Sequence, residues 1–273
     1  DFDIDTDLSL KKGTYMQEEF DELMLTCLYK NGILHIDDLS MTKKGLMGLQ
    51  ASGIVPILQS EIRETPISLS SNFSNLPLKF VHRFIPNFYN LEGYGNGSID
   101  ISGILDSTSF KYDFNVKRAK FDIIDLGYFI SKGVYNGKTL NVEQVKSESS
   151  SGSIYGAGTL PFDFNLGSKN FGKFFQKGEF KFNTHSKIKN LPFLSPYITD
   201  LDSAVGDFDI ELSLSGIESN LQRNGKIMVS NASLHTLLLS NPITSIEGFA
   251  ILEDNKLSIE NLQANINNPN EKN

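Results

Sequence analysis

The fold is decided between residues 98 and 164, where two runs alternate strictly between apolar and polar residues: Ser98-Ile99-Asp100-Ile101-Ser102-Gly103 and Phe110-Lys111-Tyr112-Asp113-Phe114-Asn115-Val116. This period of two is typical of β-strands with one dry face and one wet face. The pattern continues at Leu140-Asn141-Val142 and closes on Gly156-Ala157-Gly158-Thr159-Leu160-Pro161-Phe162. We therefore expect an all-β fold, an antiparallel sheet whose apolar face is the working surface.

Turn signals separate the alternating runs. The pair Asn31-Gly32 predicts a tight hairpin, and further Asn-Gly pairs follow at Asn96-Gly97, Asn136-Gly137 and Asn224-Gly225. The glycine-rich segment 93–97 precedes a strand, whereas a dinucleotide site would need a helix there, so we interpret it as a turn.

Pieces of the same unit recur along the chain. Gly53 precedes Pro56 by three residues, and Gly158 precedes Pro161 by the same spacing. The Ser-Gly pair that ends at Gly103 occurs again at Gly216. The period is roughly 105 to 120 residues, and units that cannot close their own core stack into an elongated array. We predict a partial repeat over 1–70, a complete repeat over 71–164 and a further, truncated repeat over 165–273. The alternation is already under way at the first residues, as expected of a piece of a longer protein.

Two proline-containing segments, 75–91 and 190–201, interrupt the alternation. Because proline disfavours central strands, we expect short helical or compact connectors there. They would plug one end of the sheet core, or, as the alternative, cap an apolar channel.

Composition excludes several classes of function. A net charge of -8 and the absence of a basic patch argue against a nucleic-acid partner. The single cysteine, Cys27, cannot form an internal disulfide and is expected to be a small core residue.

Catalytic constellations are not apparent. The histidines His35, His82, His185 and His235 are scattered, and no second histidine or cysteine completes a ligand set near any of them. No Gly-x-Ser-x-Gly elbow occurs, and no spacing specifies facing carboxylates. We therefore expect neither catalytic activity nor a cofactor nor a metal.

The order of these features resembles a known repeat. A Leu-Pro connector, a strand ending in Ser-Gly, an Asn-Gly hairpin and glycines leading into a second Leu-Pro span Leu76-Pro77 to Leu160-Pro161, and again Leu191-Pro192 to Leu262. This order is similar to the AsmA-like superfamily, most closely its TamB (translocation and assembly module) family.

The resemblance implies a long, curled β-sheet that forms a groove with an apolar interior. It further implies a periplasmic location, an inner-membrane anchor outside these residues, and a role in carrying phospholipid between the inner and outer membranes. The partners it implies are phospholipid acyl chains and an outer-membrane β-barrel assembly protein, contacted through other regions.

Strand parity selects the side chains that would line such a groove: Ile99, Ile101, Phe110, Tyr112, Phe114, Val116, Leu140, Val142, Phe208, Ile210, Leu212, Leu214, Leu257 and Ile259. A continuous apolar lining would lower the cost of moving an acyl chain through water, about 0.8 kcal/mol per CH2 group. The alternative is a structural or adhesive β-scaffold in which the same residues fill a closed core. A transmembrane β-barrel also alternates, but the Asn- and Pro-rich connectors count against it.

Overall fold

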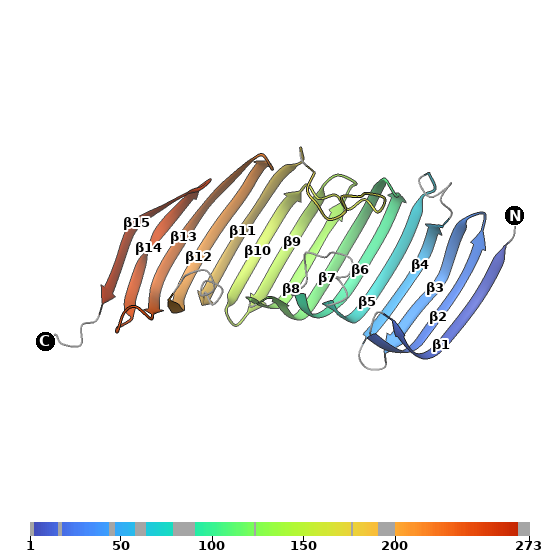
Figure 1. The fold of residues 1–273 in the computed structure, drawn as a ribbon, viewed down its shortest axis with the longest axis horizontal. Helices are drawn as coiled ribbons and strands as arrows, with labels where there is room; N and C mark the ends of the chain where they lie inside the picture. Colours follow the sequence, from blue (N-terminus) through green and yellow to red (C-terminus); the bar gives the residue numbers. More distant parts are fainter. Residues whose placement is uncertain are drawn as a thin grey trace.

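A computed structural model describes residues 3–15, 18–43, 47–57, 64–78, 91–122, 124–175, 177–190 and 200–266. Within these ranges the regular structure is one antiparallel sheet of fifteen strands in chain order (Figure 1). The strands are β1 (Ile4–Tyr15), β2 (Glu18–Lys30), β3 (Ile33–Lys43), β4 (Met47–Pro56), β5 (Ile67–Pro77), β6 (Leu91–Ile104), β7 (Ser107–Phe121), β8 (Ile124–Tyr135), β9 (Leu140–Ser149), β10 (Gly152–Leu160), β11 (Glu179–Asn190), β12 (Leu201–Ile217), β13 (Asn220–Thr236), β14 (Ile243–Glu253) and β15 (Lys256–Ile266).

The sheet is open, because β1 and β15 lie at its two ends and do not pair with each other. Every strand bonds to its neighbours in the sequence, so the body extends along one direction (Figure 1). The prediction of an elongated, all-β antiparallel sheet is confirmed.

Hairpin turns form where the backbone can adopt a left-handed conformation. Asn31 and Gly32 join β2 to β3 with φ of 50° and 79°, as a two-residue hairpin requires. Asn136 and Gly137 begin the connection from β8 to β9, where Gly137 has a φ of 85°. Both turn predictions are confirmed.

The other two Asn-Gly pairs are not turns. Gly97 lies inside β6 and Gly225 inside β13, so the turn expected over 93–97 is wrong. At Gly97 an added Cβ would lie 2.3 Å from the Asp113 carbonyl oxygen of the adjacent strand. Glycine is used here for a close approach of two backbones within the sheet.

Backbone geometry repeats every six strands. Gly53 in β4 and Gly158 in β10 have φ of 148° and 146°, and a Cβ on either would lie 2.0 Å from a carbonyl oxygen of the next strand. Gly103 in β6 and Gly216 in β12 match in the same way, with φ of 104° and 100°. The glycines paired by sequence comparison therefore occupy equivalent positions in β4–β9 and β10–β15.

The predicted repeat boundaries fall inside a continuous structure. The boundary after residue 70 lies within β5, and the boundary after residue 164 lies in the connection between β10 and β11. Most of both predicted proline connectors, 79–90 and 191–199, lies outside the described residues, whereas Leu76 and Pro77 belong to β5.

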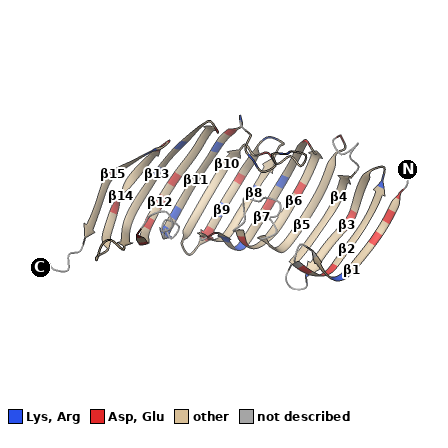
Figure 2. Ribbon diagram, in the orientation of Figure 1, with Lys and Arg blue, Asp and Glu red and all other residues tan. Residues whose placement is uncertain are grey.

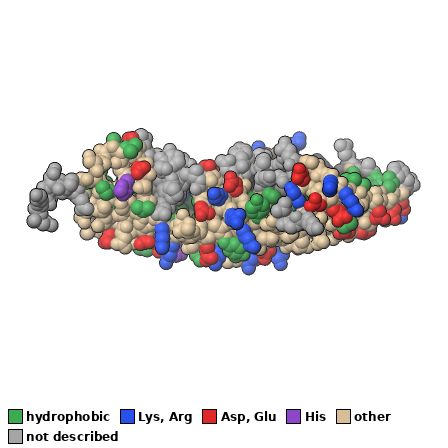
Figure 3. Space-filling view, turned by 90° about the horizontal axis from the view of Figure 1, so that it is seen from below, with side chains coloured by type: hydrophobic (Ala, Val, Ile, Leu, Met, Phe, Trp, Pro, Cys, Tyr) green, Lys and Arg blue, Asp and Glu red, His purple; other side chains and the backbone are tan. Residues whose placement is uncertain are grey.

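Charged residues of both signs are interspersed along the strands, and β1 carries several acidic ones (Figure 2). Viewed along one edge, the molecule is long and narrow, with hydrophobic side chains in small groups between the charges (Figure 3). This distribution matches the absence of a basic patch in the sequence.

Candidate functional site: the apolar face

One face of the sheet carries a row of uncharged, mostly apolar residues that crosses all fifteen strands. Residues directly opposite each other in an antiparallel pair point to the same face, so the register can be followed from one strand to the next. It connects, in order from β1 to β15, Leu10, Leu23, Met41, Leu49, Phe73, Gly97, Phe114, Ser131, Val145, Gly156, Thr184, Leu212, Gly225, Leu252 and Leu257. Strands about 4.8 Å apart make this row about 67 Å long.

A second row runs beside the first from β1 to β12. It contains Leu8, Leu25, Leu39, Ala51, Ser71, Ile99, Tyr112, Gly133, Val142, Gly158, Phe182 and Leu214. Neither row contains a charged residue. We call the side of the sheet that carries both rows the apolar face.

All fourteen residues predicted to line a groove lie on this apolar face, as the register shows. Their exposure differs with position. Four are buried (Tyr112, Val116, Val142, Phe208), seven are half-buried (Ile99, Ile101, Phe110, Phe114, Leu140, Ile210, Leu214) and three are exposed (Leu212, Leu257, Ile259). The two most exposed belong to the edge strand β15, which has a neighbour on one side only.

Gaps left by small residues on the apolar face are filled by aromatic neighbours. Tyr112 leans over Gly133, where a Cβ would lie 3.0 Å from the tyrosine oxygen, and its hydroxyl is 3.2 Å from that of Ser131. Burial raises the pKa of Tyr112, partly offset by this hydrogen bond. The apolar face over β7 and β8 is thereby closed at Ser131 and Gly133, although both residues are small.

A strap, made of the described residues 161–175 and 177–178, borders the apolar face along one margin, where β10 leads into β11 (Figure 1). Its Phe164 ring lies 6.0 Å from Phe110 and 5.7 Å from Tyr135, measured between centroids, and Phe174 lies 4.9 Å from Phe180. Tyr135 is fully buried beneath it. The strap therefore builds an aromatic wall beside β7 to β11.

Polar contacts hold the strap in place. Asn165 is buried, accepts a hydrogen bond from the Thr108 amide at 3.0 Å and donates one to the Gly137 carbonyl at 2.9 Å. Its side chain also donates to Asp163 at 3.0 Å. One asparagine thus ties the strap to the β6–β7 and β8–β9 turns. Alternation did not predict this strap: Phe162 to Leu166 alternate as a strand would, yet they lie outside the sheet, and what distinguishes the segment is its density of phenylalanine.

The opposite margin of the apolar face is closed by small hydrophobic clusters. One contains Val116 and Ala119, placed side by side by a bulge at Arg118, whose φ is 54°. The repeat-equivalent bulge at Asn231, with φ of 50°, brings Ala232 into a cluster with Phe208. A third cluster unites Phe20, Met41 and Met47. The apolar rows thus lie between clusters on one side and, over β7–β11, the strap on the other.

The second face of the sheet is polar. A row of opposed residues on it runs from β4 to β13 through Ser52, Ser70, Asp100, Lys111, Val134, Asn141, Thr159, Lys181, Ser215 and Gln222. The two faces therefore differ as strand alternation requires.

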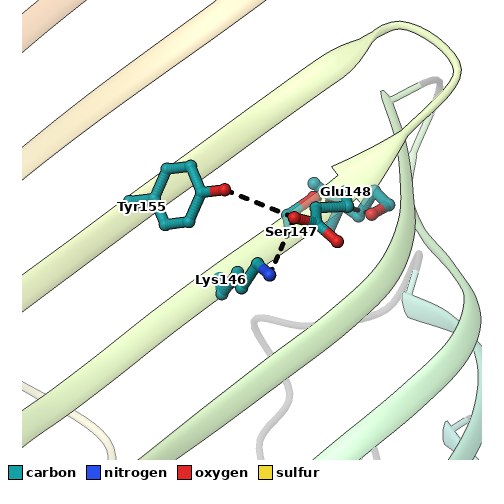
Figure 4. Close-up of polar contacts among 5 residues, drawn as sticks. Lys146, Ser147, Glu148 and Tyr155 are labelled. Atoms are coloured by element: carbon teal, nitrogen blue, oxygen red, sulfur yellow. Dashed lines mark hydrogen bonds and ion pairs between the residues drawn. The ribbon is translucent and has the colours of Figure 1, made fainter.

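A polar cluster on β9 and β10 shows this division at close range (Figure 4). The Lys146 ammonium lies 2.7 Å from a Glu148 carboxylate oxygen, to which the Tyr155 hydroxyl donates at 3.3 Å. The hydrogen bond between Lys146 and Glu148 raises the pKa of the lysine and lowers the pKa of the glutamate. Ser147, between them in sequence, is buried and donates instead to the Leu126 carbonyl at 2.6 Å.

Two shallow hollows lie over β9 to β15, with volumes of about 670 and 1040 Å3. The first is lined by polar-face side chains such as Tyr155, His185 and Glu211, and the second by Lys187 and Asp209. His185 and Asp209 stand between them, 2.7 Å apart. These hollows open on the polar face, and of the predicted groove lining only Leu212 contributes to the first and Phe208 to the second.

Within the described ranges, no group of three or more histidine, cysteine or acidic residues is arranged to hold a metal ion. The same part of the chain contains no helix of the length and apolarity needed to cross a membrane. Cys27 is buried, as predicted. Comparison of the chain with protein-family models, curated proteins and solved structures finds no match.

Proposed function

We propose that the protein is a non-enzymatic lipid carrier whose apolar face holds phospholipid acyl chains. The observation that carries this proposal is the uncharged row from Leu10 to Leu257, which crosses the whole sheet. An acyl chain lying along it would meet an uncharged position at every strand and an apolar side chain at most of them, instead of water.

Partial exposure supports a surface that takes up a ligand. Ile101 and Phe114 are half-buried and Leu212 is 38% exposed, although they occupy central strands. Within the described residues no second sheet packs over them. Covering apolar area removes it from water at about 25 cal/mol per Å2, so an acyl chain gains stability wherever such side chains are uncovered.

The polar face is suited to contact with water. Its serine, lysine and aspartate rows keep one side of the sheet hydrated, so lipid has a preferred side. The periplasmic location, the transport between membranes and the outer-membrane partner stay predictions that rest on the family resemblance.

Site-specific photo-crosslinking tests the proposal. A photoreactive residue at Ile101, Phe114 or Leu212 should capture phospholipid, whereas the next residue on each strand, Asp100, Asn115 or Ser213, points to the polar face and should not. Mass spectrometry of the adducts gives the measurement. Equal capture on both faces would refute the proposal, and absence of capture together with a bound protein would favour the adhesive scaffold.

A further inference from the structure

The connection between β13 and β14, residues 237–242, exposes three consecutive leucines. Leu237 and Leu238 are 78% and 76% exposed, more than any other large hydrophobic residue in the described ranges, and Leu239 is 43% exposed. The turn lies on the edge shown in Figure 3, where hydrophobic side chains are visible toward the C-terminal end. Exposed apolar groups of this kind mark interaction sites.

The hairpin does not need this length. In the preceding repeat β7 ends at Phe121 and β8 begins at Ile124, so the equivalent connection is four residues shorter than 237–242. Both hairpins carry the same bulge, at Arg118 and Asn231, before the turn. The leucines are therefore an addition to a hairpin that closes without them.

The three leucine amides of the turn are hydrogen-bonded within the protein. The Leu237 amide donates to the Asp200 carbonyl at 2.9 Å, and the amides of Leu238 and Leu239 donate to the side chain and carbonyl of Thr236 at 3.1 and 3.4 Å. No charged residue occurs between Thr236 and Ile243. Because unpaired amides and charges make entry into hydrocarbon costly, their absence at the leucines points to an apolar surrounding.

We propose that this turn inserts into the interfacial region of a lipid bilayer and docks this end of the sheet on a membrane. Two adjacent side chains that are both about three-quarters uncovered cannot be enclosed by a flat protein surface, whereas hydrocarbon surrounds a protruding turn on all sides. The Phe208–Ala232 cluster of the apolar face lies along the same margin, so docking brings that face to the bilayer. The inference goes beyond lipid carriage and does not depend on it.

The sequence offers a direct reporter, because it contains no tryptophan. In L238W the emission should shift to the blue on addition of phosphatidylcholine vesicles and be quenched by brominated lipid. Met228, 41% exposed on the polar face of β13, provides the control M228W, which should show neither effect. An L238W spectrum that vesicles leave unchanged would overturn the proposal.

The double variant L237S/L238S separates this inference from lipid carriage. Its partition into phosphatidylcholine vesicles, measured by flotation, should fall by at least about tenfold, since each leucine removed forfeits the burial of a whole apolar side chain. Capture of a soluble short-chain phospholipid by a crosslinker at Ile101 should be unchanged. If the wild type does not float but forms oligomers that the double variant loses, the turn is a contact between copies and the membrane proposal is wrong.

Discussion

Tyr112 lies over Gly133 of the neighbouring strand, so a small residue and a large one together make one smooth patch of the apolar face. Its hydroxyl reaches Ser131, which is itself buried. Each of the two hydroxyls satisfies the other, and burial without that partner would be costly. The continuity of the apolar face therefore depends on single pairs of residues, in which a large side chain of one strand covers a small residue of the next.

We expect Y112F to lower the free energy of unfolding by about 1 kcal/mol, because the buried Ser131 hydroxyl loses its partner. Burial raises the pKa of Tyr112 above its usual 10.0, so the folded state keeps a proton that the unfolded state loses. Its contribution is therefore complete below about pH 10 and declines as the pH rises from there toward the folded pKa.

Urea titrations below and above pH 10 measure both effects. Y112F should reduce the alkaline loss of stability, and Tyr135, whose pKa burial also raises, should account for part of the remainder. Y128F, at an exposed tyrosine of β8, is the control. An unchanged pH slope in Y112F would contradict the assignment.

At the scale of elements, the strap gives an open sheet a point of closure. Strands pair only with their neighbours in chain order, whereas the strap reaches from β10 back to the start of β7 through Asn165 and Thr108. Asn165 connects segments more than 50 residues apart in the sequence, since its partner Thr108 is 57 positions away. The aromatic wall depends on this polar anchor.

N165A should destabilise the protein by about 2 to 4 kcal/mol, because the Thr108 amide and the Gly137 carbonyl both lose a buried partner. Thermal denaturation followed by circular dichroism provides the measurement, and N170A, an exposed asparagine of the same strap, provides the control. Equal melting temperatures for the two variants would show that the anchor does not hold the strap.

At the scale of the whole molecule, the fold is an open array of strands in chain order, and its apolar side chains lie on one face of the sheet instead of inside a closed core. Each strand is stabilised by two neighbours, and the apolar rows lengthen with every strand added. A polar side chain introduced on such a face stays partly hydrated, so its cost in stability is limited. The same side chain introduced into a sealed core loses its water and destabilises the protein more. This difference separates the carrier from the closed scaffold.

F114D should leave a folded, β-rich protein whose stability falls by roughly 2 kcal/mol, since the half-buried ring loses its contacts with Tyr112 and Phe129. Lipid capture at Ile101 should decrease, because a carboxylate now interrupts the apolar row. Circular dichroism and the crosslinking assay measure the two effects, with N115D on the polar face as control. Complete unfolding of F114D would indicate a sealed core and favour the scaffold.

The sequence by itself determined the fold class, the parity of every predicted lining residue and the pairing of the glycines that turn out to be equivalent, because alternation and glycine spacing are local properties. It misplaced the turn at 93–97, because an Asn-Gly pair occurs both in turns and at places where glycine allows two strands to approach closely. Only the tertiary structure decided that the rows align across fifteen strands, that the strap walls β7 to β11 and that Leu237 and Leu238 are uncovered. Register, long-range anchoring and exposure depend on residues distant in the chain, and no local pattern contains them.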